Sequence, residues 1–236
     1  MAAARSRAER QASKRAHILR VASRVFAARK AEPLVSDVVN AVMHLGDSGD
    51  SFEEHELYSG LQILAQGGIG TSANLIGSIV LVLCEHPDIQ ERVRRDLQLV
   101  PALVEEVLRL EPPAAMLFRT ATRDVEIAGQ QVRKGDKVGL FFGAANRDPA
   151  VFDRPDEVDI DRPRNPHLSF GAGVHRCVGS NLARLQVRVA VEQLLARLSP
   201  FRLPEGAKVQ YAGDLSRGPL SLPLEFTARS LAEERA

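Results

Sequence analysis

The chain has 236 residues, 44% of them hydrophobic, and its 31 basic side chains nearly balance its 30 acidic ones. These values predict an ordinary soluble globular protein with one substantial core or two small ones. Two cysteines, Cys84 and Cys177, are too few for a disulfide framework and favour a reducing, cytoplasmic setting. Because no apolar run reaches roughly 18 residues and no secretory signal is seen, we expect no membrane association.

The N-terminal segment is basic, with only Glu9 opposing the Arg and Lys residues between Met1 and Lys30. Such a pattern is found in transit peptides and in nucleic-acid-binding arms. Its apolar residues, however, fall on one helical stripe, formed by Ile18, Val21, Ala22, Val25 and Phe26. An amphipathic helix that docks through this stripe accounts for both features, so we expect no nucleic-acid partner.

Helices are expected over most of the first half of the chain. The first ends at Pro33, and a second covers residues 36–45. Ser51 and Glu54 form a capping-box pattern that opens a helix running to just before Pro87. At 1.5 Å per residue this helix is about 45–50 Å long, enough to cross a whole domain.

Two shorter helices and a strand-rich segment follow. Pro87 and Pro101 each begin a helix, and Pro112 ends the second one. Residues 119–148 predict short strands, with turns near Gly129 and Gly135.

The last third of the chain begins with an irregular segment, Asp148 to Pro166, which is rich in Pro, Asp and Arg. A final long helix is then predicted, and weak strand signals follow Pro200. The apolar residues of that helix are Leu182, Leu185, Val189 and Leu194. No internal repeat and no linker divides the sequence, so we expect a single domain over residues 1–236.

One cysteine lies in a glycine-rich stretch, HLSFGAGVHRCVGSNLAR, which runs from His167 to Arg184. Glycines remove side chains around Cys177, as a loop requires when a bulky flat ligand lies against it. The helix that follows directs its free N–H groups and the positive end of its dipole toward the cysteine, which favours a thiolate. A thiolate is a metal ligand or a nucleophile.

Three chemistries use such a thiolate. A zinc site needs more ligands than the pair that His175 and Cys177 supply. A nucleophile needs a general base and an acyl or disulfide context, which the sequence does not show. Thiolate ligation of heme iron needs one cysteine only, because the porphyrin supplies the other four donors.

This stretch resembles the heme-binding signature of the cytochrome P450 family, in the form used by soluble bacterial members. A match of this length and spacing is highly specific. The matching residues are Phe170, Gly171, Gly173, His175, Cys177, Gly179, Leu182, Ala183 and Arg184. The resemblance implies that Cys177 ligates the iron of heme b (iron protoporphyrin IX) and pushes electron density toward O–O cleavage. It also implies that Phe170, Gly171 and Gly179 help to bind the cofactor.

A second set of matches consists of charged residues. Glu106 and Arg109 resemble the family's Glu-x-x-Arg element, although such a pair alone is common on helix surfaces. The resemblance implies that both join Arg162 in a charged network that holds the irregular segment and keeps the cysteine loop in register. Arg119 and His175 resemble the residues that pair with heme propionates, with ordinary surface charges as the alternative.

The long helix carries a third match, GGIGTSAN at residues 67–74. It resembles the family's oxygen-binding groove, in which an acid precedes a threonine. The threonine is Thr71, which would hydrogen-bond the bound oxygen species, but the acid position is Gly70. Gly67 would lie against the cofactor. Glycines inside a helix cost roughly 1 kcal/mol each relative to alanine, so they serve another purpose, with helix packing or a kink as the alternative.

The resemblance covers almost the entire chain but only the C-terminal half of the P450 fold. The fold class it implies is mainly α with a small β component, including the long distal helix and the cysteine-loop heme site. We expect a truncated heme-binding domain that lacks the N-terminal half, with apolar faces left uncovered.

Two functions follow from the resemblance. The first is a heme-thiolate monooxygenase that inserts one oxygen atom from O2 into a small organic substrate, in secondary or xenobiotic metabolism. Its expected partners are a ferredoxin-type electron donor with its reductase, and a separate N-terminal half is a further candidate. The second is a non-catalytic remnant or heme-binding partner subunit of a split cytochrome P450.

Overall fold

The computed structural model describes residues 53–198, 200–213 and 215–227, together with five helical residues near the N-terminus, Arg20, Val21, Ser23, Arg24 and Ala28. The rest of the predicted N-terminal helix, the helix over residues 36–45 and the capping residue Ser51 lie outside the described residues. The chain divides into two compact units, residues 1–69 and 70–236, and the division falls inside a long helix. The expectation of a single domain stays a prediction.

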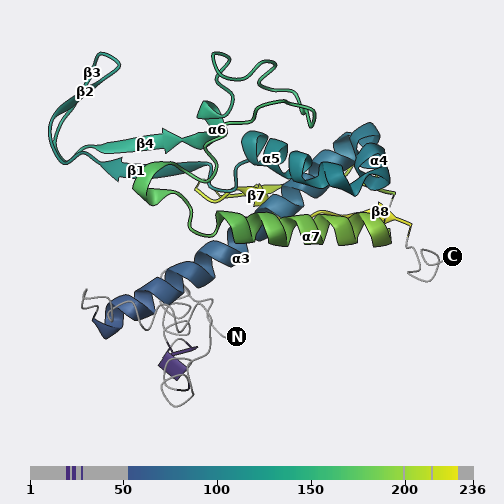
Figure 1. Cartoon of the computed structure of the whole chain (residues 1–236), viewed down its shortest axis with the longest axis horizontal. Helices are drawn as coiled ribbons and strands as arrows, with labels where there is room; N and C mark the ends of the chain where they lie inside the picture. Colours follow the sequence, from purple (N-terminus) through teal and green to yellow (C-terminus); the bar gives the residue numbers. More distant parts are fainter. Residues whose placement is uncertain are drawn as a thin grey trace, which may run out of the picture. The chain divides into compact units, whose positions relative to one another are not determined.

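Helices make up most of the described chain (Figure 1). The helical elements are α3 Glu54–Glu85, α4 Pro87–Arg95, the 3-10 turn η2 Leu97–Leu99, α5 Val100–Leu110, α6 Phe142–Ala145, the 3-10 turn η3 Gly173–His175 and α7 Ser180–Leu198. Pro87 and Pro101 lie in the first turns of α4 and α5, as predicted, because a helix does not need the N–H that proline lacks at those positions.

The strands are short and form two-stranded ribbons. The strands are β1 Met116–Thr120, β2 Val125–Ile127, β3 Gln130–Val132, β4 Lys137–Phe141, β5 Phe201–Arg202, β6 Tyr211–Ala212, β7 Gly218–Pro219 and β8 Glu225–Phe226. β1 pairs antiparallel with β4, and β2 pairs antiparallel with β3. The β2–β3 hairpin turns at Gly129, whose φ of 79° is the left-handed conformation that glycine adopts freely, so the turn predicted there is confirmed.

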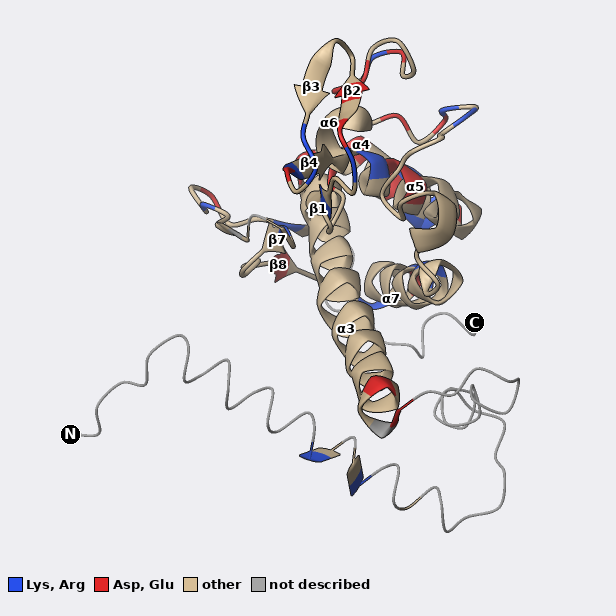
Figure 2. Ribbon diagram, turned by 90° about the vertical axis from the view of Figure 1, so that its left-hand side faces the viewer, with Lys and Arg blue, Asp and Glu red and all other residues tan. Residues whose placement is uncertain are grey.

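The long helix α3 has 32 residues, which at 1.5 Å per residue is about 48 Å. Its first turn is closed by Glu56, whose carboxylate accepts the Glu53 backbone N–H at 2.9 Å. Figure 2 shows that charged residues lie at the ends of α3 and hardly anywhere between them. The segment His55–Glu85 is therefore long and apolar enough to cross a membrane by length and composition, contrary to the expectation that no run is. A helix in a protein core passes the same test, and Leu75, Ile79 and Leu83 of α3 are core residues.

The core of the larger unit is built where four helices meet. Residues 70–85 of α3 contribute Ile79 and Leu83, and α4 contributes Val93. Helices α5 and α7 lie side by side (Figure 1), with Leu103 and Val187 both fully buried. Burial of these aliphatic side chains is the main source of stability in this unit.

Helix α7 buries a different face from the one that carries Leu182, Leu185 and Val189. Of the four apolar residues named from the sequence, Leu194 packs against the core, but the other three are exposed. Leu182, Leu185 and Val189 are 56%, 59% and 47% exposed and form one stripe along the helix. Val187, Val191 and Leu195 are buried instead. The uncovered stripe matches the expectation that some faces of the chain are apolar and open.

Glycines in α3 are of two kinds. A Cβ added at Gly77 would lie 2.7 Å from Cγ of Pro219, so this glycine lets strand β7 approach the helix closely. A Cβ added at Gly70 would meet nothing within 4 Å. Helix α3 is assigned as helix on both sides of Gly70, and close packing within the described part of the chain does not account for this glycine.

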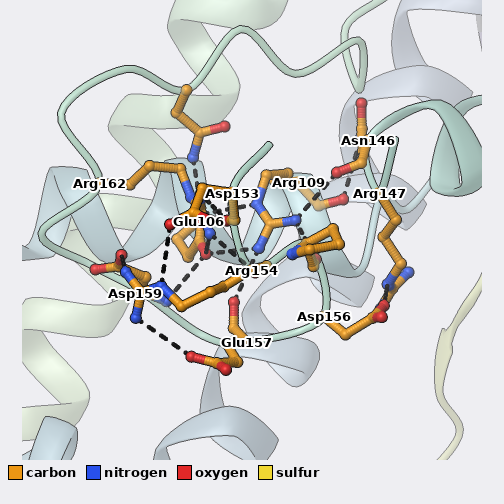
Figure 3. A network of polar contacts seen from close by, with 12 residues as sticks. Glu106, Arg109, Asn146, Arg147, Asp153, Arg154, Asp156, Glu157, Asp159 and Arg162 are labelled. Carbon is orange, nitrogen blue, oxygen red and sulfur yellow. Dashed lines mark hydrogen bonds and ion pairs between the residues drawn. The ribbon is translucent and has the colours of Figure 1, made fainter. Parts of the chain in front are cut away.

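The irregular segment 148–166 is held by a buried carboxylate on α5 (Figure 3). Glu106 is 1% exposed and accepts two hydrogen bonds from Arg109, at 2.7 and 2.9 Å. It also accepts the Asp159 backbone N–H at 3.0 Å and pairs with Arg162 at 3.4 Å. Burial raises the pKa of Glu106, but the bonds from Arg109 and Asp159 outweigh it, so its pKa lies below the ordinary value.

Arg109 carries the second half of this network. Its side chain is fully buried and donates to the backbone carbonyls of Asn146, Pro155 and Glu157. Its guanidinium also lies 5.2 Å from the ring centroid of Phe152, within the range of a cation–π contact. One α5 side chain therefore satisfies the C-cap carbonyl of α6 and two carbonyls of the segment 148–166, which has no regular secondary structure.

We predict that Glu106→Gln lowers the free energy of unfolding by about 3 kcal/mol, because it leaves the Arg109 charge buried and unpaired. Glu106 has a depressed pKa, so its contribution is present above its ordinary pKa of 4.5 and is lost as the pH falls through its lower folded value. The variant should therefore lose less stability than the native chain on acidification. Chemical denaturation from pH 7 to pH 3 measures both effects.

The matched control is Asp161→Asn, which breaks the exposed 2.8 Å ion pair with Arg92. Little change is expected from it, since exposed pairs contribute little. Equal effects of the two substitutions would show that the buried network does not hold the segment.

We also predict opposite effects from alanine at the two kinds of glycine in α3. Gly70→Ala should raise the free energy of unfolding by about 1 kcal/mol, because alanine is the better helix former and has room there. Gly77→Ala should lower it by about 1 kcal/mol or more, because the added methyl forces Pro219 to move. Urea denaturation of both variants tests this, and a stabilised Gly77→Ala chain would contradict the close approach of α3 and β7.

Candidate functional site

The cysteine predicted as a ligand lies in a loop with a defined backbone. The Cys177 N–H donates to the Phe170 carbonyl at 2.8 Å, which closes the loop upon itself. Between them, η3 forms one turn, with the Arg176 N–H donating to the Gly173 carbonyl at 3.1 Å. Gly171 and Gly173 have φ values of 66° and 67°, so the turn itself requires glycine at these two positions. Gly179 differs, because a Cβ there would make ordinary contact with Sγ of Cys177 at 3.9 Å.

The thiol of Cys177 stands exposed just before helix α7. The Ser180 N–H donates to the Cys177 carbonyl, and the Ala183 N–H donates to the Gly179 carbonyl at 2.8 Å, so the helix begins within three residues of the thiol. The second cysteine, Cys84, is half-buried at the end of α3 and packs against the core. Burial raises the pKa of Cys84, and the neighbouring Glu85 raises it further.

The surroundings of Cys177 fit a flat apolar ligand that brings its own metal donors. Val174 and Val178 flank the thiol and are 98% and 87% exposed, and Leu182 lies one turn further along. A macrocycle lying on the thiol would cover these side chains. Among the described residues, no group of three or more His, Cys, Asp or Glu could hold a metal ion.

The two candidate propionate partners are exposed and separate. His175 ends η3 in the cysteine loop, and Arg119 lies on β1, where its guanidinium donates to the Phe118 carbonyl at 2.9 Å. The structure places no bond between Arg119 and His175 among the described residues. Both remain available to charged groups of a ligand.

The groove residues predicted on the long helix lie in its middle. Gly67 and Gly70 are exposed on α3, and Thr71 is partly buried. The next residue, Ser72, is buried and its hydroxyl donates to the Gln186 side chain of α7 at 3.3 Å. This bond fixes residues 70–85 of α3 against α7, the helix that follows the cysteine.

Sequence reasoning missed a buried amide that ties the network to the cysteine loop. Asn146 is fully buried, and its side chain donates to the Arg109 carbonyl and to the Ser169 hydroxyl. Its Oδ1 accepts the Leu168 N–H at 2.7 Å. An asparagine directly after the predicted strands was the available signal, but asparagine is equally common in turns.

A shallow cavity of about 340 Å³ lies beside the loop, between α5 and the segment 165–173. Its lining includes Glu105, His167 and Arg184, and the Glu105 carboxylate bonds each of the other two. Cys177 does not line it, so the cavity is separate from the exposed face that carries the thiol.

Comparison with known proteins places these features in a family. The model of the family described as "Cytochrome P450" matches residues 9–211. The "Biotin biosynthesis cytochrome P450" of Bacillus subtilis is 42% identical over 177 residues, which are 75% of this chain and 44% of the relative. The "Mycinamicin IV hydroxylase/epoxidase" of Micromonospora griseorubida is 38% identical over 200 residues, which are 83% of this chain and 50% of the relative. The chain thus spans about half the length of the curated relatives it matches.

Solved structures agree. P450BioI in complex with an acyl carrier protein ligated to hexadec-9Z-enoic acid has a TM-score of 0.84 and 36% identity, covering 94% of this chain and 57% of that one. CYP109E1 from Bacillus megaterium in complex with corticosterone has a TM-score of 0.86 and 26% identity, covering 95% and 61%. These matches confirm the expected fold class, mainly helical with a small β component and corresponding to one part of the P450 fold. The family match over most of the sequence and the identity to these relatives show that the chain belongs to the cytochrome P450 family.

Proposed function

We propose that the chain provides the heme-thiolate half of a monooxygenase that inserts one oxygen atom from O2 into a small organic substrate. The observation that carries this proposal is the exposed thiol of Cys177, in a loop closed by its own backbone bonds and flanked by exposed valines. When bound, heme b would supply the oxygen activation. The cytoplasmic setting and the single heme-binding domain are parts of the same proposal.

The chain's own residues would bind and orient the reactants. Cys177 would be the one protein ligand, and Phe170, Gly171 and Gly179 would shape the loop under the cofactor. Arg119 and His175 would pair with its carboxylates through charge-assisted hydrogen bonds. Gly67 and Gly70 would leave room for the cofactor and for oxygen beside α3. The Thr71 hydroxyl would hold a proton for transfer to the oxygen.

The partners of such a half follow from its surface and from its relatives. A ferredoxin-type donor with its reductase would supply electrons. The apolar stripe of Leu182, Leu185 and Val189 needs a cover of matching apolar character. We propose that a separate polypeptide, equivalent to the half of the P450 fold that this chain does not span, provides it along with most of the substrate pocket.

A second candidate function is a non-catalytic remnant or a heme-binding partner subunit. The observation that favours it is Gly70, which stands where the resemblance expects an acid beside the groove threonine. A chain that no longer turns over has no need of that acid.

Cys177→Ser should abolish the red-shifted thiolate band of the reduced, carbon-monoxide-bound spectrum of the heme-loaded chain. Cys84→Ser should leave that band in place, because Cys84 packs against the core. The spectrum of each variant after addition of heme is the measurement. Exchanged behaviour of the two variants, or no thiolate band in the native chain, would overturn the assignment.

Gly70→Asp should raise the amount of product formed per reductant consumed, because it restores an acid that can pass protons to the Thr71 hydroxyl. The chain complemented with an N-terminal half is the preparation to use, with product, reductant and released peroxide measured together. Gly70→Asn is the matched control, since it adds the same volume without an ionisable group. Unchanged coupling with normal heme binding would favour the non-catalytic remnant.

A further inference from the structure

Two consecutive glutamates on α5, Glu105 and Glu106, form hydrogen bonds with different parts of the chain. Glu106 faces the irregular segment, whereas Glu105 faces α7, because successive helical residues point about 100° apart. The Glu105 carboxylate accepts both arms of the Arg184 guanidinium, at 2.6 and 2.8 Å. It also bonds Nε2 of His167 at 3.0 Å. This second cluster plays no part in the network around Arg109.

His167 fixes the start of the cysteine loop. Its side chain is 3% exposed, and its Nδ1 accepts the Ser169 N–H at 3.2 Å, so the proton on Nε2 points to Glu105. The Ser169 hydroxyl in turn donates to the Leu108 carbonyl of α5 at 2.6 Å. The carbonyl of the next residue, Phe170, accepts a hydrogen bond from the Cys177 N–H. Residues 167–169 are therefore bonded to α5 directly before Phe170, whose bond to Cys177 closes the loop.

Arg184 fixes the end of the loop. It lies just over one turn into α7, and its guanidinium carbon is 4.5 Å from the Phe170 ring centroid. The bidentate bond to Glu105 raises the pKa of Arg184, and the charge of Cys177 adds to that increase. Burial raises the pKa of Glu105, but the bonds from Arg184 and His167 outweigh it and lower its pKa to about 2. The pair is therefore a charged carboxylate and a charged guanidinium, and the guanidinium lies over the ring of Phe170, the residue whose carbonyl accepts the Cys177 N–H.

We propose that Glu105 is a positioning residue for the cysteine ligand, holding both ends of the loop through His167 and Arg184 and balancing the charge of the guanidinium that lies over Phe170. The electrostatic part of this inference rests on the proposed heme-thiolate function. The loop-holding part rests on the protein alone.

The two parts have different signatures. Loss of either Glu105 or Arg184 loosens the loop, so both variants change loop order in the same direction. Their charge effects are opposite, because Glu105→Gln leaves a net positive charge beside the cysteine loop and Arg184→Gln leaves a net negative one. A positive charge favours the reduced, more negative form and raises the reduction potential, and a negative charge lowers it. A purely structural role cannot produce shifts of opposite sign.

Hydrogen exchange of the full chain, with and without added heme, tests the first part. Amides in the segment 168–179 should exchange about tenfold faster or more in Glu105→Gln and Arg184→Gln, as expected for the loss of charge-assisted hydrogen bonds. Glu91→Gln is the matched control, because Glu91 on α4 also bonds two arginines and also has a pKa lowered to about 2, but lies outside the loop cluster. Unchanged exchange in the segment, or equal change in the control, overturns the loop-holding role.

Spectroelectrochemical titration of the heme-loaded chain tests the second part. The potential should rise in Glu105→Gln, fall in Arg184→Gln and return close to the native value in the double variant. Shifts of the same sign, or none, overturn the electrostatic role while leaving the exchange result to decide the first part. If the native chain takes up no heme, the proposed function fails, and the exchange result still decides whether Glu105 holds the loop.

Discussion

The fully buried ion pair between Glu106 and Arg109 holds the irregular segment that leads into the cysteine loop. A segment without regular secondary structure has backbone carbonyls that need donors, and Arg109 donates to two of them, on Pro155 and Glu157. An arginine in that position carries a charge that costs several kcal/mol to bury alone, and Glu106 offsets it. The pair thus holds residues 148–166 against α5. This contact positions the start of the cysteine loop, which directly follows the segment.

Helix α5 is therefore the element that positions the site, although it contributes no ligand. Glu106 and Arg109 hold the segment before the cysteine loop. Asn146 bonds Ser169 at the start of the loop, and Glu105 bonds Arg184 in the helix that follows it. The thiol itself needs no buried partner, which leaves Cys177 exposed on a rigid support. A ligand atom held this way is what a cofactor covering Val174 and Val178 requires.

Much of this could be predicted from residue patterns. The starts of α4 and α5 could be predicted because proline restricts its own backbone to a conformation that suits a first helical turn. The β2–β3 turn could be predicted because glycine adopts positive φ freely. The buried face of α7 could not be predicted, because Leu185 and Val187 are equally apolar and only the neighbouring helices decide which is covered. Glu105 and Asn146 were missed for a related reason: their partners lie 79 and 22 residues away in the chain. The ligand-facing roles of Thr71, Arg119 and His175 stay proposals.

X-ray absorption at the iron edge of the heme-loaded chain would identify the iron ligand, because it reports which atoms are bonded to the metal. We expect one sulfur neighbour in addition to the porphyrin nitrogens, supplied by Cys177 and unaffected when Cys84 is replaced. An iron surrounded only by nitrogen and oxygen in the native chain would contradict this expectation.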